Sequence, residues 1–274
     1  MTDTLRAACI QMTSGPNMAV NLAEAERLIR RAIAEGAQFI ATPENTCQIR
    51  HPATEKLKTA MVEDKHPGIP MFSKLASGFG VWLLAGSFSI KVSDRKIANR
   101  SFLFAPDGTI AAQYDKIHLF DADLSAGEQY RESDIVEPGN KLVVAETPWG
   151  GVGLSICYDL RFAYHYRSLA HKGAAIMTVP AAFTVPTGKA HWEILLRARA
   201  IETGSFVIAP AQTGEHDNGR RTWGHSMIID PWGNVLADGG AETGIIIADL
   251  AMQDVEKARR SIPALKHDRT HFQM

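Results

Sequence analysis

Three side chains in this sequence occupy positions that suit chemistry. Glu44, Lys116 and Cys157 each lie at or just after the end of a predicted strand. In sheets covered by helices, strand ends are where side chains converge on a pocket. Each residue also has an ordinary interpretation: a solvated turn acid, a surface charge and a core thiol. Taken singly, the sequence leaves both interpretations open.

Together the three residues form a complete set for nucleophilic catalysis. A thiol needs a base or a nearby cation before it attacks. Glu44 can accept the proton of Cys157, and Lys116 can stabilise the thiolate and then the oxyanion that forms when an acyl carbon is attacked. A helix expected after Cys157 adds the backbone N–H of Tyr158, which would point from a helix N-terminus. This chemistry requires the side chains to meet in one dry pocket.

The elements that would position these residues follow from apolar patterning. The predicted strands cover residues 5–11, 37–42, 81–91, 97–105, 109–115, 141–147, 152–157, 174–179, 205–211, 224–230 and 244–250. The predicted helices cover residues 22–35, 56–62, 71–79, 162–171 and 191–203, and a last one begins near Asp254. Strands that alternate with helices and hairpins predict a layered α/β fold with mixed sheets. Without a recognisable linker, we expect one domain over residues 1–274.

Composition excludes several classes of protein. The 274 residues include 29 Lys+Arg and 30 Asp+Glu, so no strongly basic face for nucleic acid is expected. The start of the chain resembles no secretory signal, and the apolar stretch 173–186 is too short to span a bilayer, which predicts a cytoplasmic protein without a membrane partner. Three cysteines without CxxC, and the absence of HExxH, Walker A and GxGxxG motifs, predict neither metal nor cofactor.

Three blocks of the chain resemble the catalytic blocks of the nitrilase superfamily. They are the segments 42–44, 114–121 and 156–162, in the order and approximate spacing of that family. Further stretches, 180–184, 187–193, 195–203 and 224–233, are similar to its Nit branch, so the resemblance covers nearly the whole chain. The resemblance implies a four-layer α-β-β-α sandwich with two mixed β-sheets. It also implies hydrolysis of a non-peptide carbon–nitrogen bond without a metal.

The resemblance also extends the expected site. Residues 130–133 are similar to the family segment that carries a second carboxylate, which makes Glu132 the candidate, although Glu128, Glu132 and Glu137 could all be solvated loop acids. In the loop 181–190, Phe183, Thr187 and Lys189 are candidates for substrate binding.

A cation for a substrate carboxylate is expected next to the nucleophile. Arg161 follows Cys157 by one helical turn and can face the same pocket. The alternative is an ion pair with Asp159 or another nearby acid. His118 and His225 are expected to be hydrogen-bonded structural histidines.

One segment departs from the family pattern. The family commonly has Pro-Glu-Leu or Ala-Glu-Leu after the Arg-Phe pair, whereas this chain continues Ala163-Tyr164-His165-Tyr166. The missing glutamate puts substrate details or the dimer surface in question. The Nit branch usually forms dimers through the face around this helix, so we expect a homodimer or a higher homo-oligomer, with Tyr164, His165 and Tyr166 at the interface.

The expected activity is that of a thiol amidohydrolase. It would cleave the primary amide of a small carboxylate-bearing substrate through a cysteine thioester, with release of ammonia. The Nit branch includes enzymes for deaminated glutathione and ω-amidases for α-ketoglutaramate, and the segment 211–221 is more similar to the first type. The alternatives are the ω-amidase, a nitrilase or N-carbamoyl hydrolase with the same triad, and an idle interaction protein on this scaffold. A redox thiol protein is disfavoured because no resolving cysteine lies nearby.

Overall fold

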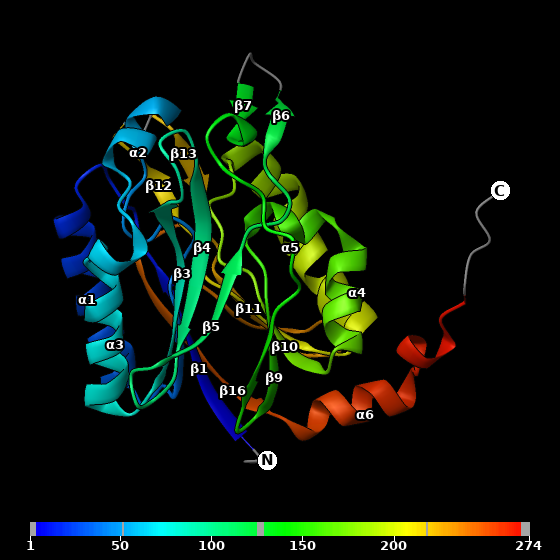
Figure 1. Ribbon diagram of the computed structural model, residues 1–274. Coiled ribbons are helices and arrows are strands. Elements are labelled where there is room, and N and C mark those ends of the chain that lie inside the picture. The colour runs from blue at the N-terminus through cyan, green and yellow to red at the C-terminus, as the bar shows by residue number, and fades with distance from the viewer. Residues whose placement is uncertain (1–3, 51, 125–128, 218, 270–274) are drawn as a thin grey trace.

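The computed structural model describes residues 4–50, 52–124, 129–217 and 219–269. Two six-stranded β-sheets lie face to face at its centre, and two helices cover the outer side of each sheet (Figure 1). This α-β-β-α sandwich with two mixed sheets confirms the fold expected from the sequence. Within the described ranges, no helix combines the length and the apolar character needed to cross a membrane.

The first sheet carries the N-terminal half of the chain and one C-terminal strand. Its strands are β1 (Thr4–Gln11), β2 (Phe39–Ala41), β3 (Trp82–Lys91), β4 (Ile97–Phe104), β5 (Ile110–Asp115) and β16 (Gly244–Ala251), in the order β16-β1-β2-β3-β4-β5. The strands β1, β2 and β3 are parallel, whereas β16, β4 and β5 pair antiparallel to their neighbours. Helices α1 (Met18–Ala34) and α3 (Gly68–Phe79) cover its outer face. In α1 the apolar residues recur three and four apart, which gives the helix one buried face.

The second sheet is built by the rest of the chain. Its strands are β8 (Val144–Thr147), β9 (Gly150–Leu154), β10 (Ala174–Thr178), β11 (Phe206–Ala209), β14 (Met227–Ile229) and β15 (Val235–Asp238), in the order β15-β14-β11-β10-β9-β8. The central strands β9, β10 and β11 are parallel, and β11 is buried along its whole length. Helices α4 (Ala163–His171) and α5 (Val185–Thr203) cover its outer face.

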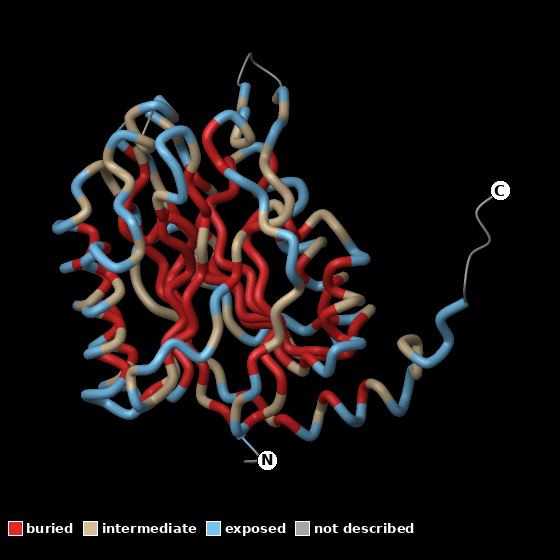
Figure 2. The backbone as a smooth tube through the Cα atoms, in the orientation of Figure 1, coloured by how far each residue is buried: buried red, intermediate tan, exposed pale blue. Residues whose placement is uncertain are grey.

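The main core lies between the sheets and continues beneath α4 and α5. One buried cluster contains Cys9 of β1, Phe39 of β2 and Ile176 of β10, so both inner faces contribute to it. A second cluster fills the space between the first sheet and its two helices. Figure 2 shows buried backbone concentrated in the sheets, with exposed residues along the outer sides of the helices. The sandwich therefore gives the strand ends a rigid support.

Short elements gather at one end of the sandwich, at the top of Figure 1. They are α2 (Ala53–Thr59), β6 (Asp121–Asp123), β7 (Gln129–Arg131), β12 (Thr213–Glu215) and β13 (Arg221–Trp223). The chain also forms the 3-10 turns η1 (Glu63–Lys65), η2 (Glu132–Asp134) and η3 (Cys157–Arg161). Helix α6 (Gln253–Ser261) and the turn η4 (Ala264–His267) follow β16.

Several predicted boundaries are wrong for local reasons. The fifth helix begins at Val185 rather than at residue 191, because Thr184 is extended and Pro186 suits a first helical turn. The strand expected to reach Cys157 ends at Leu154. The element after Cys157 is the five-residue turn η3, not an α-helix. The long connection after residue 118 contains the strands β6 and β7, which pair antiparallel. They were not predicted, because three-residue strands are too short to show a clear alternation of apolar and polar residues.

Helix α4 also corrects the predicted interface residues. His165 and Tyr166 are buried, at 1% and 0% exposure, whereas Tyr164 is 63% exposed. His165, Tyr166, Leu169 and Ala170 form the buried face of the helix, which therefore packs inward. Of the three aromatic residues expected at a surface, only Tyr164 lies there.

Candidate active site

Glu44 is held just beyond the end of β2 by the neighbouring strand. The N–H of Thr42 donates to Leu84 O of β3 at 3.0 Å, and the N–H of Gly86 donates back to Thr42 Oγ1 at 3.0 Å. Gly86 has to be glycine, because a Cβ there would lie 1.9 Å from Thr42 O. Beyond Glu44, Asn45 turns into the left-handed region with a φ of 57°. This turn directs the Glu44 carboxylate to the interior, where only 3% of the residue is exposed.

Lys116 directly follows β5. Its N–H donates to Asn99 O of β4 at 3.0 Å, and its carbonyl accepts from Gly139 N at 2.9 Å. Gly139 lets the returning chain approach closely, because a Cβ there would lie 2.2 Å from Asp115 O. The Lys116 side chain is 2% exposed. A lysine so buried requires acidic partners.

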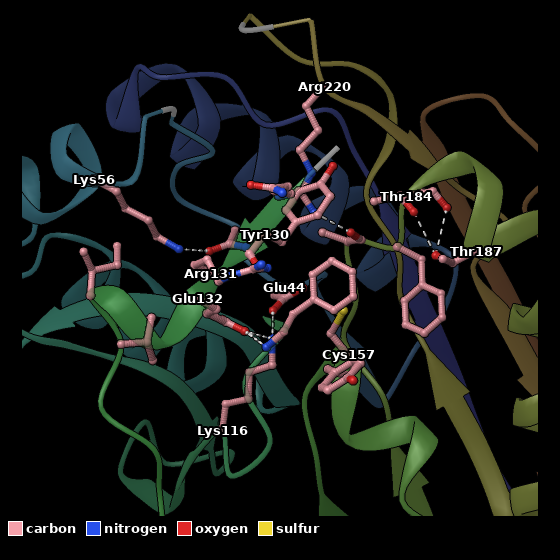
Figure 3. A pocket seen from close by; sticks show the side chains of 18 of the residues that line it. Glu44, Lys56, Lys116, Tyr130, Arg131, Glu132, Cys157, Thr184, Thr187 and Arg220 are labelled. Carbon is pink, nitrogen blue, oxygen red and sulfur yellow. Dashed lines mark hydrogen bonds and ion pairs between the residues drawn. The ribbon is translucent and has the colours of Figure 1, made fainter. Parts of the chain in front are cut away.

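Two carboxylates supply those partners. The Lys116 ammonium donates to Glu44 Oε1 at 3.0 Å and to Glu132 Oε2 at 2.8 Å. Glu132 begins the turn η2, and its Oε2 also accepts from Phe120 N at 2.7 Å. Figure 3 shows the two glutamates converging on the lysine. The structure thus brings Glu132 to the site, as expected; Glu137 is exposed, and Glu128 lies outside the described residues.

Asn99 is a member of this cluster that the sequence analysis missed. Its side-chain amide donates to Glu44 Oε1 at 2.9 Å and to Glu132 Oε1 at 3.2 Å, so it bridges the two carboxylates. A signal was present: asparagine is unfavourable in the middle of an apolar strand such as β4. A buried polar residue there points to a specific hydrogen-bonding role.

Cys157 occupies a strained turn between β9 and the second sheet's outer helices. Its φ of 50° is unusual for a residue with a side chain, and such strain often occurs at functional sites. Its N–H donates to Pro180 O at 2.9 Å, which ties the turn to the end of β10. The residue is 8% exposed and lines the same cavity as Glu44 and Lys116. The three candidates therefore meet, although they come from three different strand ends.

The charges of the resting site follow from these contacts. Burial raises the pKa of Cys157, the Glu44 carboxylate raises it further, and Lys116 only partly offsets them, so the thiol stays protonated. Burial also opposes ionisation of Glu44, but the charge of Lys116 and hydrogen bonds from Cys157 and Lys116 bring its pKa below 4.5. Burial disfavours the charged form of Lys116, yet Glu132 and Glu44 together hold its pKa well above 10.5. A thiol thus faces an ionised base beside a fixed cation.

The cavity above Cys157 has a volume of about 150 Å³. Phe183, Thr187, Tyr158 and Arg161 line it, as the sequence predicted, whereas Lys189 is exposed on α5 and does not. Because α5 begins at Val185, residue 189 lies within the helix, and the buried residues Thr187, Gly188 and Trp192 define its inward face. The expectation that Lys189 faces the substrate cavity is therefore wrong.

Arg161 lies on one side of the cavity against aromatic rings. Its guanidinium is 5.8 Å from the centroid of Tyr158 and 5.4 Å from that of Phe183, and it contacts His191 Nδ1 at 3.3 Å. The alternative ion pair with Asp159 is not formed, although the structure describes both residues. The planar cation is thus available to a carboxylate in the cavity.

Comparison with known proteins identifies the family. The model of the carbon-nitrogen hydrolase family matches residues 6–260. The chain belongs to the carbon-nitrogen hydrolase family. It is 45% identical over 267 residues to a deaminated glutathione amidase of Synechocystis sp., and the aligned region covers 95% of this chain and 97% of that protein. It is 36% identical to the omega-amidase NIT2-B of Xenopus laevis, over 97% of this chain and 96% of that protein.

Solved structures give the same assignment. The hydrolase superposes on Saccharomyces cerevisiae Nit3, a member of branch 10 of the nitrilase superfamily, with a TM-score of 0.88 and 29% identity, covering 98% of each chain. Together with the amidase relatives, this shows that the chain is a hydrolase of carbon–nitrogen bonds other than peptide bonds.

A second polar cluster of the hydrolase lies behind Cys157. Asp159 Oδ2 accepts from Tyr114 Oη at 2.7 Å and from Ile156 N at 2.8 Å, and its Oδ1 accepts from the N–H of His118 at 3.0 Å. The ring of His118 also bonds Oδ1, at 2.7 Å, and stacks on Phe162. Asp159 thus links the segment that carries Lys116 to the turn that carries Cys157. From the sequence, Asp159 was expected only as a partner for Arg161, and this role was not predicted.

This cluster also contains the one group of potential metal ligands among the residues that the structure describes. Donor atoms of His118, Asp159 and His165 lie within 4.8 Å of one another. Both Asp159 oxygens and both ring nitrogens of His118 already have hydrogen-bonding partners in the protein, the second being Tyr164 Oη. These side chains therefore form a hydrogen-bonding network, in which His118 has the structural role expected from the sequence.

The remaining candidates have structural positions. His225 pairs with Asp238 at 3.0 Å and stacks on Trp223, and its carbonyl accepts from Trp192 Nε1. Cys9 and Cys47 lie in the two hydrophobic clusters, outside the cavity, and burial raises the pKa of both thiols.

Proposed function

We propose that the hydrolase cleaves amides through a thioester on Cys157. Glu44 takes the thiol proton as Sγ attacks the amide carbon, and the oxyanion is stabilised by Lys116 Nζ and the N–H of Tyr158. Glu44 then protonates the departing nitrogen as the carbon–nitrogen bond breaks. It next accepts a proton from water, which attacks the thioester, and the carboxylic acid and the Cys157 thiol are regenerated.

Glu132 and Asn99 have supporting roles in this proposal. Glu132 fixes the ammonium of Lys116 at 2.8 Å, which keeps the cation in place when Glu44 becomes protonated. Asn99 donates to both carboxylates and so fixes their positions relative to each other. A preorganised cation costs no rearrangement during the reaction, which is why such groups contribute strongly to catalysis.

We propose deaminated glutathione as the substrate, with α-ketoglutaramate as the second candidate. Arg161, against Tyr158 and Phe183 in the cavity wall, carries this proposal because both compounds present an α-keto acid that needs a cation. The relatives that bear these two names support the same order, at 45% and 36% identity.

The leaving group differs between the two substrates. Ammonia leaves only when the scissile amide is primary, as in α-ketoglutaramate. Deaminated glutathione consists of a 2-oxoglutaryl group joined to cysteinylglycine, so its hydrolysis releases the dipeptide. The expected release of ammonia therefore applies to the second candidate, and to a nitrilase or carbamoyl hydrolase.

Side-by-side kinetics test this proposal. We expect kcat/KM to be highest for deaminated glutathione, lower for α-ketoglutaramate and lowest for a plain aliphatic amide. A tenfold preference for α-ketoglutaramate, equal to about 1.4 kcal/mol of transition-state binding, would reverse the order. A preference for the plain amide would remove both substrates and the role of Arg161, and a lack of any hydrolysis would favour the interaction protein.

We further propose a homodimer formed through the face of α4 and α5. Tyr164 is 63% exposed, and Ile194 and Ile201 of α5 are 69% and 54% exposed, which is unusual for such large apolar side chains. A monomeric mass by light scattering at micromolar concentration would contradict this. A cytoplasmic location stays a prediction from the sequence.

A further inference from the structure

Several cations besides Arg161 line the cavity, and one of them is Lys56. Lys56 of α2 lines the cavity, half-buried, and its ammonium donates to Asn45 Oδ1 at 2.7 Å. Asn45 directly follows Glu44, and its own N–H is fixed by Ser87 Oγ at 2.9 Å. Figure 3 shows Lys56 reaching toward the region of Glu132 and Glu44. The lysine is thus placed beside Glu44.

The charge of Lys56 is not neutralised by an ion pair. Its ammonium donates to the neutral amide of Asn45, and none of the carboxylates in the described part of the chain forms a salt bridge with it. Glu44 and Glu132, the nearest source of negative charge in the cavity, are both bonded to Lys116. Burial lowers the pKa of Lys56, and Glu132 and Glu44 offset this only in part. A half-buried cation held by a neutral group is suited to an anionic ligand.

The position of Glu44 defines which part of a substrate meets Lys56. Glu44 protonates the departing nitrogen, so the leaving amine must lie on the Glu44 side of Cys157. The acyl group then extends toward Arg161, Tyr158 and Phe183. Ammonia has no group that could reach Lys56. An extended dipeptide carries its carboxylate about 7 Å from its amino nitrogen, beyond hydrogen-bonding distance of Glu44.

We propose that Lys56 forms a subsite for the carboxylate of the leaving amine, and that this subsite selects amides of dipeptides over primary amides. The inference rests on the proposed function, since it assumes an amide cleaved at Cys157 with Glu44 as proton donor. It assigns the two carboxylates of deaminated glutathione to two cations: the α-keto acid to Arg161 and the glycine carboxylate to Lys56.

Substitution of Lys56 tests the subsite by a ratio of two substrates. In Lys56→Met, the ratio of kcat/KM for deaminated glutathione to that for α-ketoglutaramate should fall roughly ten- to a hundredfold, the usual effect of losing a charged hydrogen bond. Lys56→Arg, which keeps the charge, should restore most of the ratio. The matched control is Lys58→Met on the same helix, because Lys58 is exposed and pairs with Glu55. It should leave the ratio unchanged.

A change in the substrate provides a second, independent measurement. Deaminated glutathione with its glycine carboxylate converted to an amide should lose as much kcat/KM on the unmodified enzyme as Lys56→Met loses on the natural substrate. The two changes combined should cost no more than either alone, because both remove the same contact. Additive losses, or an unchanged ratio in Lys56→Met, would overturn the subsite while leaving the proposed function intact. Hydrolysis of neither substrate by the unmodified enzyme would instead overturn the proposed function, and the subsite with it.

Discussion

Two buried polar clusters adjoin Cys157. They differ in whether their side chains can still exchange hydrogen-bonding partners. The cavity cluster of Glu44, Lys116 and Glu132 faces the thiol and the space where a substrate would bind. The network of Asp159 lies behind Cys157. The two Asp159 oxygens accept four hydrogen bonds there, two of them from backbone N–H groups.

The comparison shows how two buried carboxylates come to have different uses. Glu44 bonds a thiol, an ammonium and a side-chain amide, and the thiol can give up its proton. Asp159 is fixed by donors that cannot rearrange without moving the backbone. The first arrangement supports proton transfer, whereas the second holds the Lys116 and Cys157 segments in register. Variants of the two clusters should show this difference between proton transfer and positioning.

Removal of the nucleophile should have the largest effect. Cys157→Ala should be folded, with a kcat/KM at least about 10⁴-fold lower, because no other group in the cavity can form the thioester. Iodoacetamide should label Cys157 faster than Cys9 or Cys47, which are 0% and 2% exposed. Substantial activity in the alanine variant would make the cavity cluster a binding site only.

Loss of the cation should affect both turnover and stability. Lys116→Ala removes an oxyanion donor, so kcat should fall about a hundredfold or more. It also leaves Glu44 and Glu132 buried without their partner, so the free energy of unfolding should decrease by roughly 3–5 kcal/mol. Kinetics and chemical denaturation measure the two effects, with the exposed Lys58→Ala as the control. A change in KM alone would reassign Lys116 to substrate binding.

Substitution of Asp159 should lower activity by displacing the segments that carry Lys116 and Cys157. Asp159→Asn turns an amide donor toward at least one N–H group, which should cost about 1–3 kcal/mol of stability. We expect kcat to fall about tenfold, as for a modest misplacement of reacting groups, while KM changes little. Tyr164→Phe, at the exposed end of the network, should cost less than about 1 kcal/mol. Equal effects from the two variants would contradict a central role for Asp159.

A fall in pH should have the smallest effect of these changes. It should affect the Asp159 network and the cavity cluster at different pH values. Burial lowers the pKa of His165, beside Asp159, below 6.5, so the folded protein keeps it neutral while the unfolded chain binds a proton. The contribution of His165 to stability therefore decreases as the pH falls from about 6.5, by up to about 1.4 kcal/mol per pH unit. The pKa of Glu44 is lowered from 4.5, so its carboxylate, and with it activity, is lost only below that pH.

Melting temperatures and rates across this range check the separation. The melting temperature should fall between pH 6.5 and about 5, while the activity of the folded enzyme keeps its plateau. His165→Phe should reduce the slope of stability against pH. A parallel decline of activity and stability would show that the two clusters titrate together.

The sequence predicted which of the residues proposed to react would meet better than it predicted the residues that support them. Glu44 and Lys116 follow strands that end at the same edge of the first sheet, and Cys157 reaches the same cavity from the second sheet. Family resemblance added Glu132. Asn99 was missed because it lies in the middle of a strand and acts through a side chain whose partners come from residues 44 and 132. Asp159 was missed because its partners at positions 114 and 118 are contiguous with it only in the folded chain.

The errors in the fold have equally local causes. Lys189 was expected in a loop, but Thr184 and Pro186 start α5 early and leave it on the exposed side of the helix. Cys157 was expected at the end of a strand, but its left-handed backbone breaks the pattern that an apolar run predicts. Such strain depends on tertiary contacts, here with Pro180 O, that no local pattern contains.

Trapping of the acyl-enzyme tests the central claim most directly. Deaminated glutathione mixed with the enzyme and quenched in acid within the first turnover should leave a 2-oxoglutaryl group on the peptide that contains Cys157, detected by mass spectrometry. The adduct should be absent in Cys157→Ala. An acyl group on Cys9 or Cys47, or turnover without any acylated cysteine, would contradict the thioester at Cys157.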